Sequence, residues 1–140
     1  MAIGMDEIDE KILKILEEDA RASYVDIGKK LRLSEGAVRR RVQNLVREGV
    51  IKKFTIQREF TRGTKAIVLI SVNTPLPTPE VSKALRKIEG VQMVYEVTGQ
   101  YDIAVFISGA SITDVDHCLE EVRQVKGVMN TNTLIILREW

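Results

Sequence analysis

Apolar residues recur at helical spacing near the start of the chain. Counted from the first residue of this stripe, the others follow at i+4, i+7 and i+8, which is the pattern of one buried helix face. The stripe consists of Ile8, Ile12, Ile15 and Leu16. Asp6 is expected to cap this helix, because its carboxylate can accept backbone N–H groups of the first turn.

Two further helices are predicted, each opened by a serine suited to capping. The first runs from Ser23 through Leu31 and buries Ile27 and Leu31 together with Val25 or Tyr24. After a tight turn, the second runs from Ser34 to Arg47. Its inward stripe is Val38, Val42, Leu45 and Val46. Two short helices joined by three or four residues are typical of a helix-turn-helix.

A turn and a strand are expected after the third helix. Gly49 stands where a helix end favours a left-handed residue. The following residues, Val50–Gln57, are predicted to form a strand.

The second half of the chain alternates strands and helices in the order β-α-β-β-α-β. The predicted strands are Ala66–Val72, Val91–Val97, Asp102–Ser108 and Val128–Leu137. One predicted helix is capped by Thr78, has Pro79 at its first helical position, carries the apolar stripe Val81, Ala84, Leu85 and Ile88, and stops at Gly90. The other starts at Ser111, buries Ile112, Val115, Leu119 and Val122, and ends at Gly127. This order predicts a ferredoxin-like fold.

The fold class is therefore α+β, with two domains. We expect a helix-turn-helix (winged-helix-like) domain over residues 1–52, a connecting strand and linker over 53–64, and a βαββαβ domain over 65–140. The strands of the second domain are apolar at consecutive positions, so both faces of its sheet are hydrophobic. Since the helices of this fold cover one face, we expect a second copy of the chain to cover the other.

Composition excludes several classes of protein. The single cysteine, Cys118, cannot form an intramolecular disulfide, and with one histidine, His117, we expect no metal centre. Both residues are predicted to be structural, on the polar side or flank of a helix. No apolar run approaches the ~20 residues of a membrane span. There is no signal-peptide pattern, so a cytoplasmic protein with no membrane partner is expected.

Net charge is only +1, but the charges are unevenly distributed along the chain. Residues 5–19 contain seven acidic and two basic residues, a balance of −5. Residues 29–53 contain nine basic and two acidic residues, a balance of +7. Such a local concentration of positive charge favours double-stranded DNA as a partner. The alternative is a solvated helix face.

The side of the third helix opposite its apolar stripe is predicted to contact DNA. Arg39 and Arg40 lie one turn into the helix, and arginine can bond bidentately to guanine. Lys29 and Arg32 are expected to contact phosphates, whereas Arg41, nearer the stripe, is expected to brace the domain through an ion pair. The predicted DNA-binding residues are Lys29, Arg32, Ser34, Glu35, Gly36, Arg39, Arg40 and Gln43.

Several short motifs lie along nearly the whole chain: Asp6-Glu-Ile-Asp9, Ile12-Leu-Lys-Ile-Leu16, Leu31-Arg-Leu-Ser34, Glu48-Gly-Val-Ile51 and Gly99-Gln-Tyr-Asp102. Together they resemble the Lrp/AsnC (feast/famine) transcription regulators. In two places the chain departs from the family pattern: Arg32 replaces a usual turn glycine, and Gly28 a usual helix alanine. The resemblance implies DNA binding by the first half, octamers or other assemblies of dimers, and amino-acid effectors bound between dimers.

The resemblance also implies an effector site in the second half. Asp102 can accept an ammonium group, while hydroxyl groups or loop amides can donate to a carboxylate. The alternative is that residues 99–102 are only a hairpin turn. The residues of the implied site are Gly99, Gln100, Tyr101, Asp102, Asn130, Thr131, Asn132 and Thr133.

Two functions follow from these observations. The first is a sequence-specific transcriptional regulator that forms a homodimer and senses an amino acid, with no other cofactor. The second is an effector-independent, architectural DNA-packaging protein of the same fold. An enzyme is not expected, because the chain contains no catalytic triad, phosphate loop or metal cluster.

Overall fold

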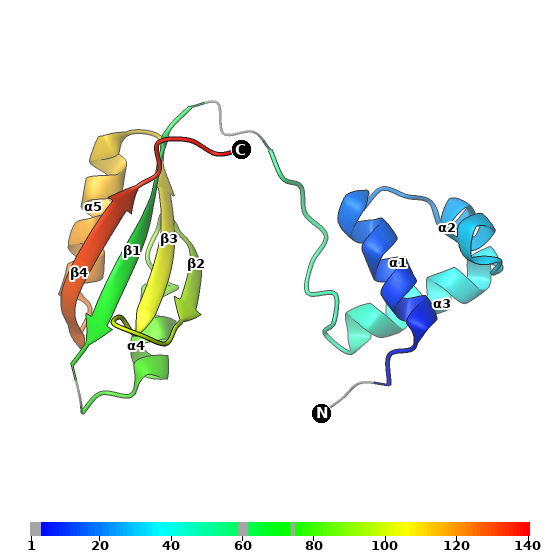
Figure 1. Cartoon of the computed structure of the whole chain (residues 1–140), viewed down its shortest axis with the longest axis horizontal. Coiled ribbons are helices and arrows are strands. Elements are labelled where there is room, and N and C mark those ends of the chain that lie inside the picture. The colour runs from blue at the N-terminus through cyan, green and yellow to red at the C-terminus, as the bar shows by residue number, and fades with distance from the viewer. Residues whose placement is uncertain (1–3, 59–61, 74) are drawn as a thin grey trace. The chain divides into compact units, whose positions relative to one another are not determined.

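The chain divides into two compact units, Met1–Arg58 and Glu59–Trp140. The protein is described from a computed structural model, which covers residues 4–58, 62–73 and 75–140. Figure 1 labels the helices and strands of both units. Residues 59–61 of the predicted linker, and Thr74 before the fourth helix, lie outside the described residues. The finer division at residues 52 and 64 stays a prediction.

Three helices build the first unit: α1 (Glu7–Glu18), α2 (Tyr24–Leu31) and α3 (Glu35–Arg47). All three predicted caps are present: the Asp6, Ser23 and Ser34 side chains each accept a backbone N–H of the first turn. The core of the unit consists of Ile12, Leu16, Ile27, Val38 and Val42. The sequence offered Val25 or Tyr24 as a buried residue of α2. Tyr24 packs against this core, whereas Val25 is half-exposed. Val46, predicted to face inward, is also half-exposed.

The turn between α2 and α3 is built by the two residues at which the chain departs from the expected motif. Arg32 adopts the left-handed conformation, with φ of 56° and ψ of 47°. The chain then turns back so closely that a Cβ at Gly28 would lie 2.5 Å from the Leu33 carbonyl oxygen. Gly28 is therefore required by this turn, and Arg32 adopts a backbone conformation that glycine would adopt at lower cost.

A long-range ion pair ties α3 to the start of α1. One guanidinium nitrogen of Arg41, Nη1, lies 2.7 Å from Asp6 Oδ2 and 2.8 Å from Asp9 Oδ1. Asp9 and Asp6 raise the pKa of Arg41. The backbone N–H of Asp9 and the Arg41 guanidinium lower the pKa of Asp6. The predicted bracing role of Arg41 is present in the structure.

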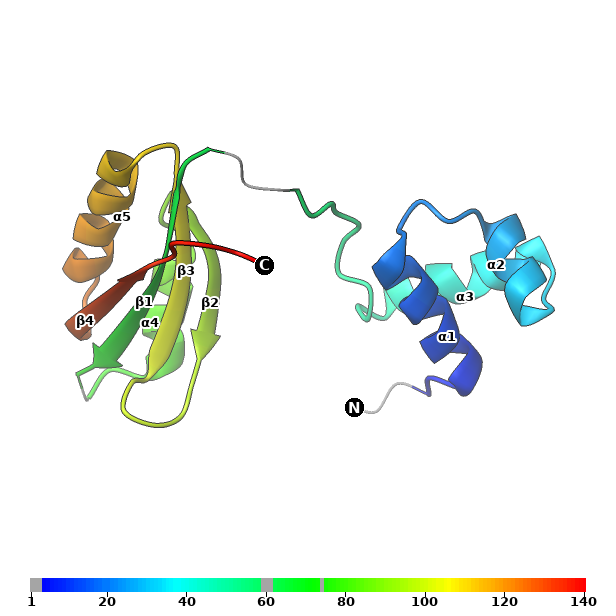
Figure 2. The same cartoon turned by 45° about the horizontal axis from the view of Figure 1, so that its top comes forward.

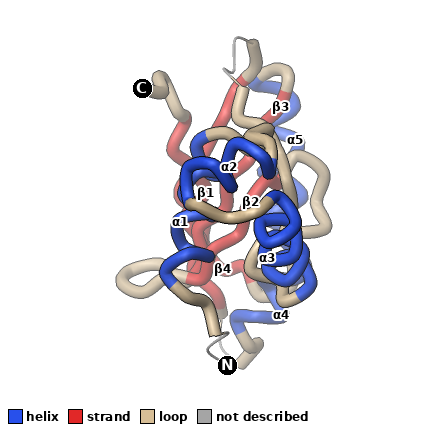
Figure 3. The backbone as a smooth tube through the Cα atoms, turned by 90° about the vertical axis from the view of Figure 1, so that its right-hand side faces the viewer, coloured by secondary structure: helices blue, strands red, loops and turns tan. Residues whose placement is uncertain are grey.

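The predicted strand at Val50–Gln57 is wrong. Apart from a hydrogen bond from the Ile51 N–H to the Leu45 oxygen, 3.1 Å long, this segment has no regular backbone pairing with the described residues. Figure 3 shows only helices and loops in the described part of the first unit. A strand needs a hydrogen-bonded neighbour, and alternation in the sequence does not supply one. Phe54 and Ile56 are accordingly exposed.

The second unit contains one four-stranded antiparallel sheet in the order β2-β3-β1-β4. Its strands are β1 (Thr64–Val72), β2 (Val91–Glu96), β3 (Ile103–Gly109) and β4 (Val128–Ile135). The helices α4 (Thr78–Leu85) and α5 (Ile112–Gln124) follow β1 and β3, which confirms the predicted βαββαβ order. The predicted strand ends differ by one or two residues, and β4 stops at Ile135 rather than Leu137.

Both helices cover the same face of the sheet (Figures 1 and 2). Buried residues of α4 and α5 share one core with alternate residues of β1 and β3, among them Val68, Ile70 and Val105. Two expectations in α4 are wrong: Pro77 is its N-cap and Thr78 its first residue, and the helix stops at Leu85, so Ile88 lies beyond it.

One inward position of α5 was predicted wrongly. Ile112 is exposed because it stands in the first turn of the helix, whereas Cys118 is buried. Cys118 packs among the core residues rather than on the polar side. Burial raises the pKa of its thiol. His117, the neighbouring residue, is exposed.

The other face of the sheet carries no helix and is apolar. We call it the open face. Its apolar residues come from all four strands, at positions paired across the ladders: Ile67, Leu69, Met93, Tyr95, Phe106 and Leu134. The Tyr95 and Phe106 rings meet edge to face, with centroids 5.8 Å apart. Cross-strand aromatic pairs of this kind stabilise a sheet surface.

Within the described ranges, no helix is long and apolar enough to cross a membrane. The same residues contain no group of three or more His, Cys, Asp or Glu side chains arranged to hold a metal ion.

Candidate nucleic-acid interface and ligand site

The face of α3 opposite the core carries the predicted DNA-contacting residues. Val38, Val42 and Leu45 are buried on one side of the helix. On the other side, Arg39, Arg40 and Gln43 are exposed. The exposed side is continuous because residues three and four apart are neighbours on a helix surface. We call this the outward face of α3, and it consists of Glu35, Gly36, Arg39, Arg40 and Gln43.

Arg39 is held by two neighbours. Its Nη2 forms an ion pair with Glu35, one turn earlier in α3. Its Cζ lies 5.2 Å from the centre of the Tyr24 ring, at the start of α2. A guanidinium at this distance over an aromatic face is attracted by the ring. The side chain of Arg39 nevertheless remains 54% exposed, so it is available to a partner.

The remaining predicted contact residues are exposed as well. Arg40, Lys29 and Arg32 are exposed and form no ion pair or hydrogen bond through their side chains with the described residues. Ser34 Oγ accepts the N–H of Ala37 at 3.1 Å, so its capping role is visible in the structure. Gly36 is exposed, and a Cβ there would meet nothing within 4 Å.

The residues expected to bind an effector gather at one end of the sheet. The Val72 N–H at the end of β1 donates to Asp102 Oδ2 at 2.8 Å. The Asn132 amide, on β4, donates to the Tyr101 hydroxyl oxygen at 3.2 Å. The loop between β2 and β3 is therefore fixed to both β1 and β4. Gly99 in this loop has a φ of 109°, which favours glycine.

These residues do not all lie on the same face of the sheet. Asn130 and Asn132 pair with Ser71 and Leu69, which places them on the open face. Thr131 and Thr133 pair with Ile70 and Val68, on the face that the helices cover. Thr131 Oγ1 accepts a hydrogen bond from Arg123 Nε of α5 at 3.5 Å. The alternation of a strand thus separates the two threonines from the two asparagines.

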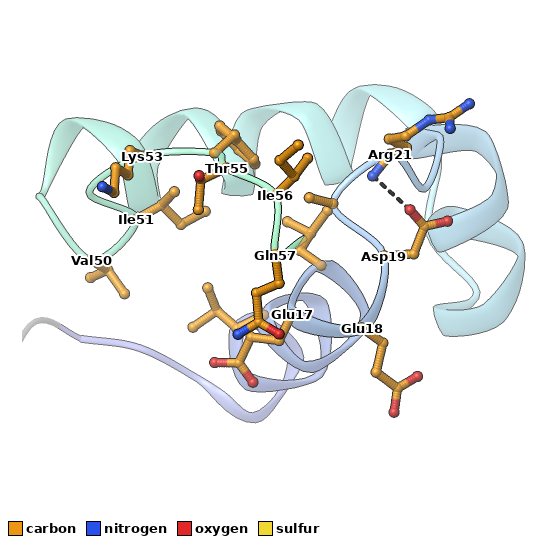
Figure 4. Close-up of a pocket in the computed structure, with 14 residues that line it drawn as sticks. Glu17, Glu18, Asp19, Arg21, Val50, Ile51, Lys53, Thr55, Ile56 and Gln57 are labelled. Carbon is orange, nitrogen blue, oxygen red and sulfur yellow. Dashed lines mark hydrogen bonds between the residues drawn. The ribbon is translucent and has the colours of Figure 1, made fainter. Parts of the chain in front are cut away.

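A groove that the sequence did not predict lies in the first unit. It has a volume of about 600 Å³ and lies between the end of α1 and residues 50–57. Figure 4 shows Glu17 and Glu18 on one side, with Lys53, Thr55 and Ile56 on the segment opposite. Its remaining walls are largely apolar, including Leu13, Leu16 and Phe54.

Comparison with protein families identifies both halves of the chain. Residues 5–46 match the AsnC-type helix-turn-helix domain. Residues 65–140 match the Lrp/AsnC ligand binding domain. The chain belongs to the Lrp/AsnC family. The resemblance seen in the sequence and the α+β fold class are both confirmed.

Similar proteins within the Lrp/AsnC family are regulators of transcription. The chain is 47% identical over 137 residues to the HTH-type transcriptional regulator LysM of Saccharolobus solfataricus, covering 98% of this chain and 96% of that one. LysM of Sulfurisphaera tokodaii is 46% identical, with 97% of each chain covered. The feast or famine regulatory protein from M. tuberculosis, solved in complex with L-methionine, is 26% identical with a TM-score of 0.85. That alignment covers 96% of this chain and 94% of the other.

The protein is thus a Lrp/AsnC transcriptional regulator, with a helix-turn-helix DNA-binding domain and a ligand-binding domain. One contact at the candidate interface was not anticipated from the sequence. Tyr24 was considered only as a core residue of α2, yet its ring also lies beneath Arg39. An aromatic residue at the start of α2 is compatible with either role, and only the crossing of the two helices brings the ring to the arginine.

Proposed function

We propose that this regulator recognises a specific DNA sequence by placing the outward face of α3 in the major groove. The observation that carries the proposal is the division of α3, with buried apolar residues on one side and exposed arginines on the other. An α-helix fits the major groove, where each base pair presents a distinct pattern of donors and acceptors. The small Gly36 lets the start of α3 approach the bases closely.

The predicted DNA-binding residues have different roles in this proposal. Arg39 and Arg40 donate to base edges, preferentially guanine, and Gln43 contacts the next bases along the helix. Lys29 and Arg32 contact phosphates, which fix the register of the protein on the duplex. Ser34 supports the start of α3 as its cap.

Selection of duplexes from a randomised pool, followed by footprinting of the enriched site, tests this function. We expect one enriched, pseudo-palindromic sequence. Arg39→Ala should weaken binding to it by about 1–3 kcal/mol. Arg86→Ala removes the same charge in the second unit and serves as the control. Uniform coverage of every duplex, with no enriched site, would instead identify a DNA-packaging protein.

We also propose that an amino acid binds at the end of the sheet near Asp102. The L-methionine bound to the M. tuberculosis relative supports this ligand class. Oδ2 of Asp102 accepts the Val72 N–H, and we assign Oδ1 to the ammonium group of the ligand. Gly99, Gln100 and Tyr101 supply the loop, and Asn130 lies on the open face. Thr131 and Thr133 face the helices instead, so they position β4 rather than contact the same ligand.

Calorimetry with each amino acid, followed by footprinting with and without the one that binds, tests the effector. Asp102→Asn retains an oxygen for the Val72 N–H and removes the charge. This variant should lose the effector response and keep its self-association. A full effector response in Asp102→Asn would show that the effector binds at another site.

The open face supports a third part of the proposal, a homodimer formed through the sheets. An exposed apolar face drawn from four strands is unusual on a monomer. Helix-turn-helix proteins commonly read two half-sites as dimers, and assemblies of dimers are consistent with the family. A monomer in light scattering at micromolar concentration would contradict this part.

A further inference from the structure

Two adjacent arginines on the outward face of α3 have different surroundings. Arg39 pairs with Glu35 and lies over the Tyr24 ring. Arg40 is exposed and forms no such contact with the described residues. Of the two arginines expected to read bases, Arg39 is thus the one whose side chain has partners before DNA is present.

We propose that Tyr24 and Glu35 are positioning residues for Arg39, and that they set how strongly the protein prefers its own DNA sequence. This inference rests on the proposed function, in which α3 reads the major groove. Neither residue needs to contact DNA for it to hold. Arg40 also donates to base edges but has no such support, so it contributes less to the sequence preference than Arg39 does.

The geometry leaves Arg39 able to read a base while it is held. A guanidinium carries five N–H donors in one plane. Glu35 accepts from Nη2, and Cζ lies over the Tyr24 ring. The donors along the remaining edge stay free for the two acceptors of a guanine.

Orientation matters because an unrestrained arginine loses considerable rotamer freedom when it binds a base. That loss is reduced when the side chain is already held in the free protein. The benefit applies to a base that matches the held geometry. Phosphates surround the duplex at every position and accept an arginine in many orientations, so non-specific binding gains less.

Glu35 also acts through its charge. Its carboxylate lies at the start of α3, on the face expected to meet DNA, where it repels phosphates. It therefore weakens binding to every duplex while it orients Arg39 for one sequence. Removing its charge should therefore raise the affinity for every duplex. The same substitution should lower the ratio of the affinities for the specific and the non-specific duplex.

The test compares the duplex enriched by the wild-type protein with a scrambled duplex of the same length and composition. At about 0.15 M salt, Glu35→Gln should tighten binding to the scrambled duplex and lower the affinity ratio of the two duplexes about 3- to 10-fold. Tyr24→Leu should lower the ratio by a similar factor without tightening the scrambled complex. Tyr24→Phe keeps the ring and should keep the ratio.

Glu48→Gln provides the matched control, because Glu48 is the exposed C-cap of the same helix and carries the same charge. It should leave the ratio unchanged. Since Tyr24 also packs against the core, thermal unfolding of each variant establishes that it is folded before its ratio is compared.

A double-mutant cycle separates positioning from any direct contact. In an Arg39→Ala background, Glu35→Gln should no longer change the ratio, because no guanidinium is left to orient. If the effect of Glu35→Gln persists there, Glu35 contacts DNA itself and the inference is wrong.

Two further outcomes also overturn the inference. One is an unchanged ratio in both Glu35→Gln and Tyr24→Leu. The other is a Glu35→Gln protein that gains more affinity for the enriched duplex than for the scrambled one, since Glu35 would then withhold Arg39 from DNA. In both cases the wild-type protein still discriminates, so the proposed function stands. If the wild-type protein enriches no sequence, the result contradicts the proposed function itself, on which the inference rests.

Discussion

The two units of this protein present opposite kinds of surface. The first unit exposes charged side chains on the outward face of α3, above a small core that includes Ile12 and Ile27. The second unit has a larger core and exposes a second apolar surface, the open face of its sheet. Separate, oriented cationic side chains suit the binding of a polyanion such as DNA. An apolar surface suits association with a second copy of the chain.

The units also differ in what stabilises them. In the first unit, side-chain caps on all three helices and the ion pairs of Arg41 with Asp6 and Asp9 supplement a core of few residues. The second unit relies mainly on apolar residues packed between the sheet and two helices. Small units with little apolar burial depend more on such polar contacts.

Truncating one core residue in each unit should give the largest effect. Ile12 and Ile103 are both fully buried, one in each core. Each change to alanine should lower the free energy of unfolding of its own unit by about 2–5 kcal/mol. Denaturant unfolding followed by hydrogen exchange would measure this. Ile56→Ala, at an 80% exposed position, is the control. A loss shared equally by both units would show that they unfold together.

A charge on the open face should break the predicted dimer while sparing the first unit. Leu134 is a half-exposed residue of this face. Leu134→Glu should weaken self-association by about 30-fold or more, which corresponds to ~2 kcal/mol. Analytical ultracentrifugation over a range of concentrations would measure it. Ile112→Glu, on an exposed position of α5, should leave the association unchanged.

The turn of the first unit should respond differently to changes at its two unusual residues. Gly28→Ala forces a Cβ against the Leu33 oxygen and should cost about 1–3 kcal/mol in unfolding free energy. Arg32→Gly removes the left-handed penalty and should raise stability by about 1 kcal/mol or less. Thermal unfolding compares the two. Equal losses in both variants would show that the turn has no such strain.

The smallest effect concerns the pH dependence of the stability of the first unit, which relies on polar contacts more than the second unit does. The pKa of Asp6 lies below its ordinary value of 3.8 in the folded protein, so its contribution to stability is present above that value. The contribution is lost as pH falls from 3.8 through the lowered pKa. Asp6→Asn should therefore flatten the acid side of the stability profile. Thermal unfolding across this pH range measures the effect, and an unchanged acid side in Asp6→Asn would contradict it.

Much of the fold follows from the sequence because local rules determine it. The caps at Asp6, Ser23 and Ser34 and the βαββαβ order depend on neighbouring residues and on periodicity. The errors at Val50–Gln57 and Ile112 arise where a regular pattern lacks a packing partner or lies at a helix end.

The candidate sites were less predictable for the same reason. The sequence placed Arg39 on the correct face of α3, but the contact with Tyr24 depends on how two helices cross. Residues 130–133 lie next to one another in the chain, yet the register of β4 with β1 sends alternate side chains to opposite faces. Contacts across elements, rather than within them, decide such details.

The tight turn between α2 and α3 also constrains the order in which the sequence can change. A methyl group added at Gly28 meets a backbone oxygen that cannot move while the turn keeps its shape. A glycine at position 32 meets no such obstacle and gives the turn more freedom to adjust. A lineage that changes both positions should therefore replace Arg32 first and Gly28 second, because the reverse order passes through the less stable intermediate.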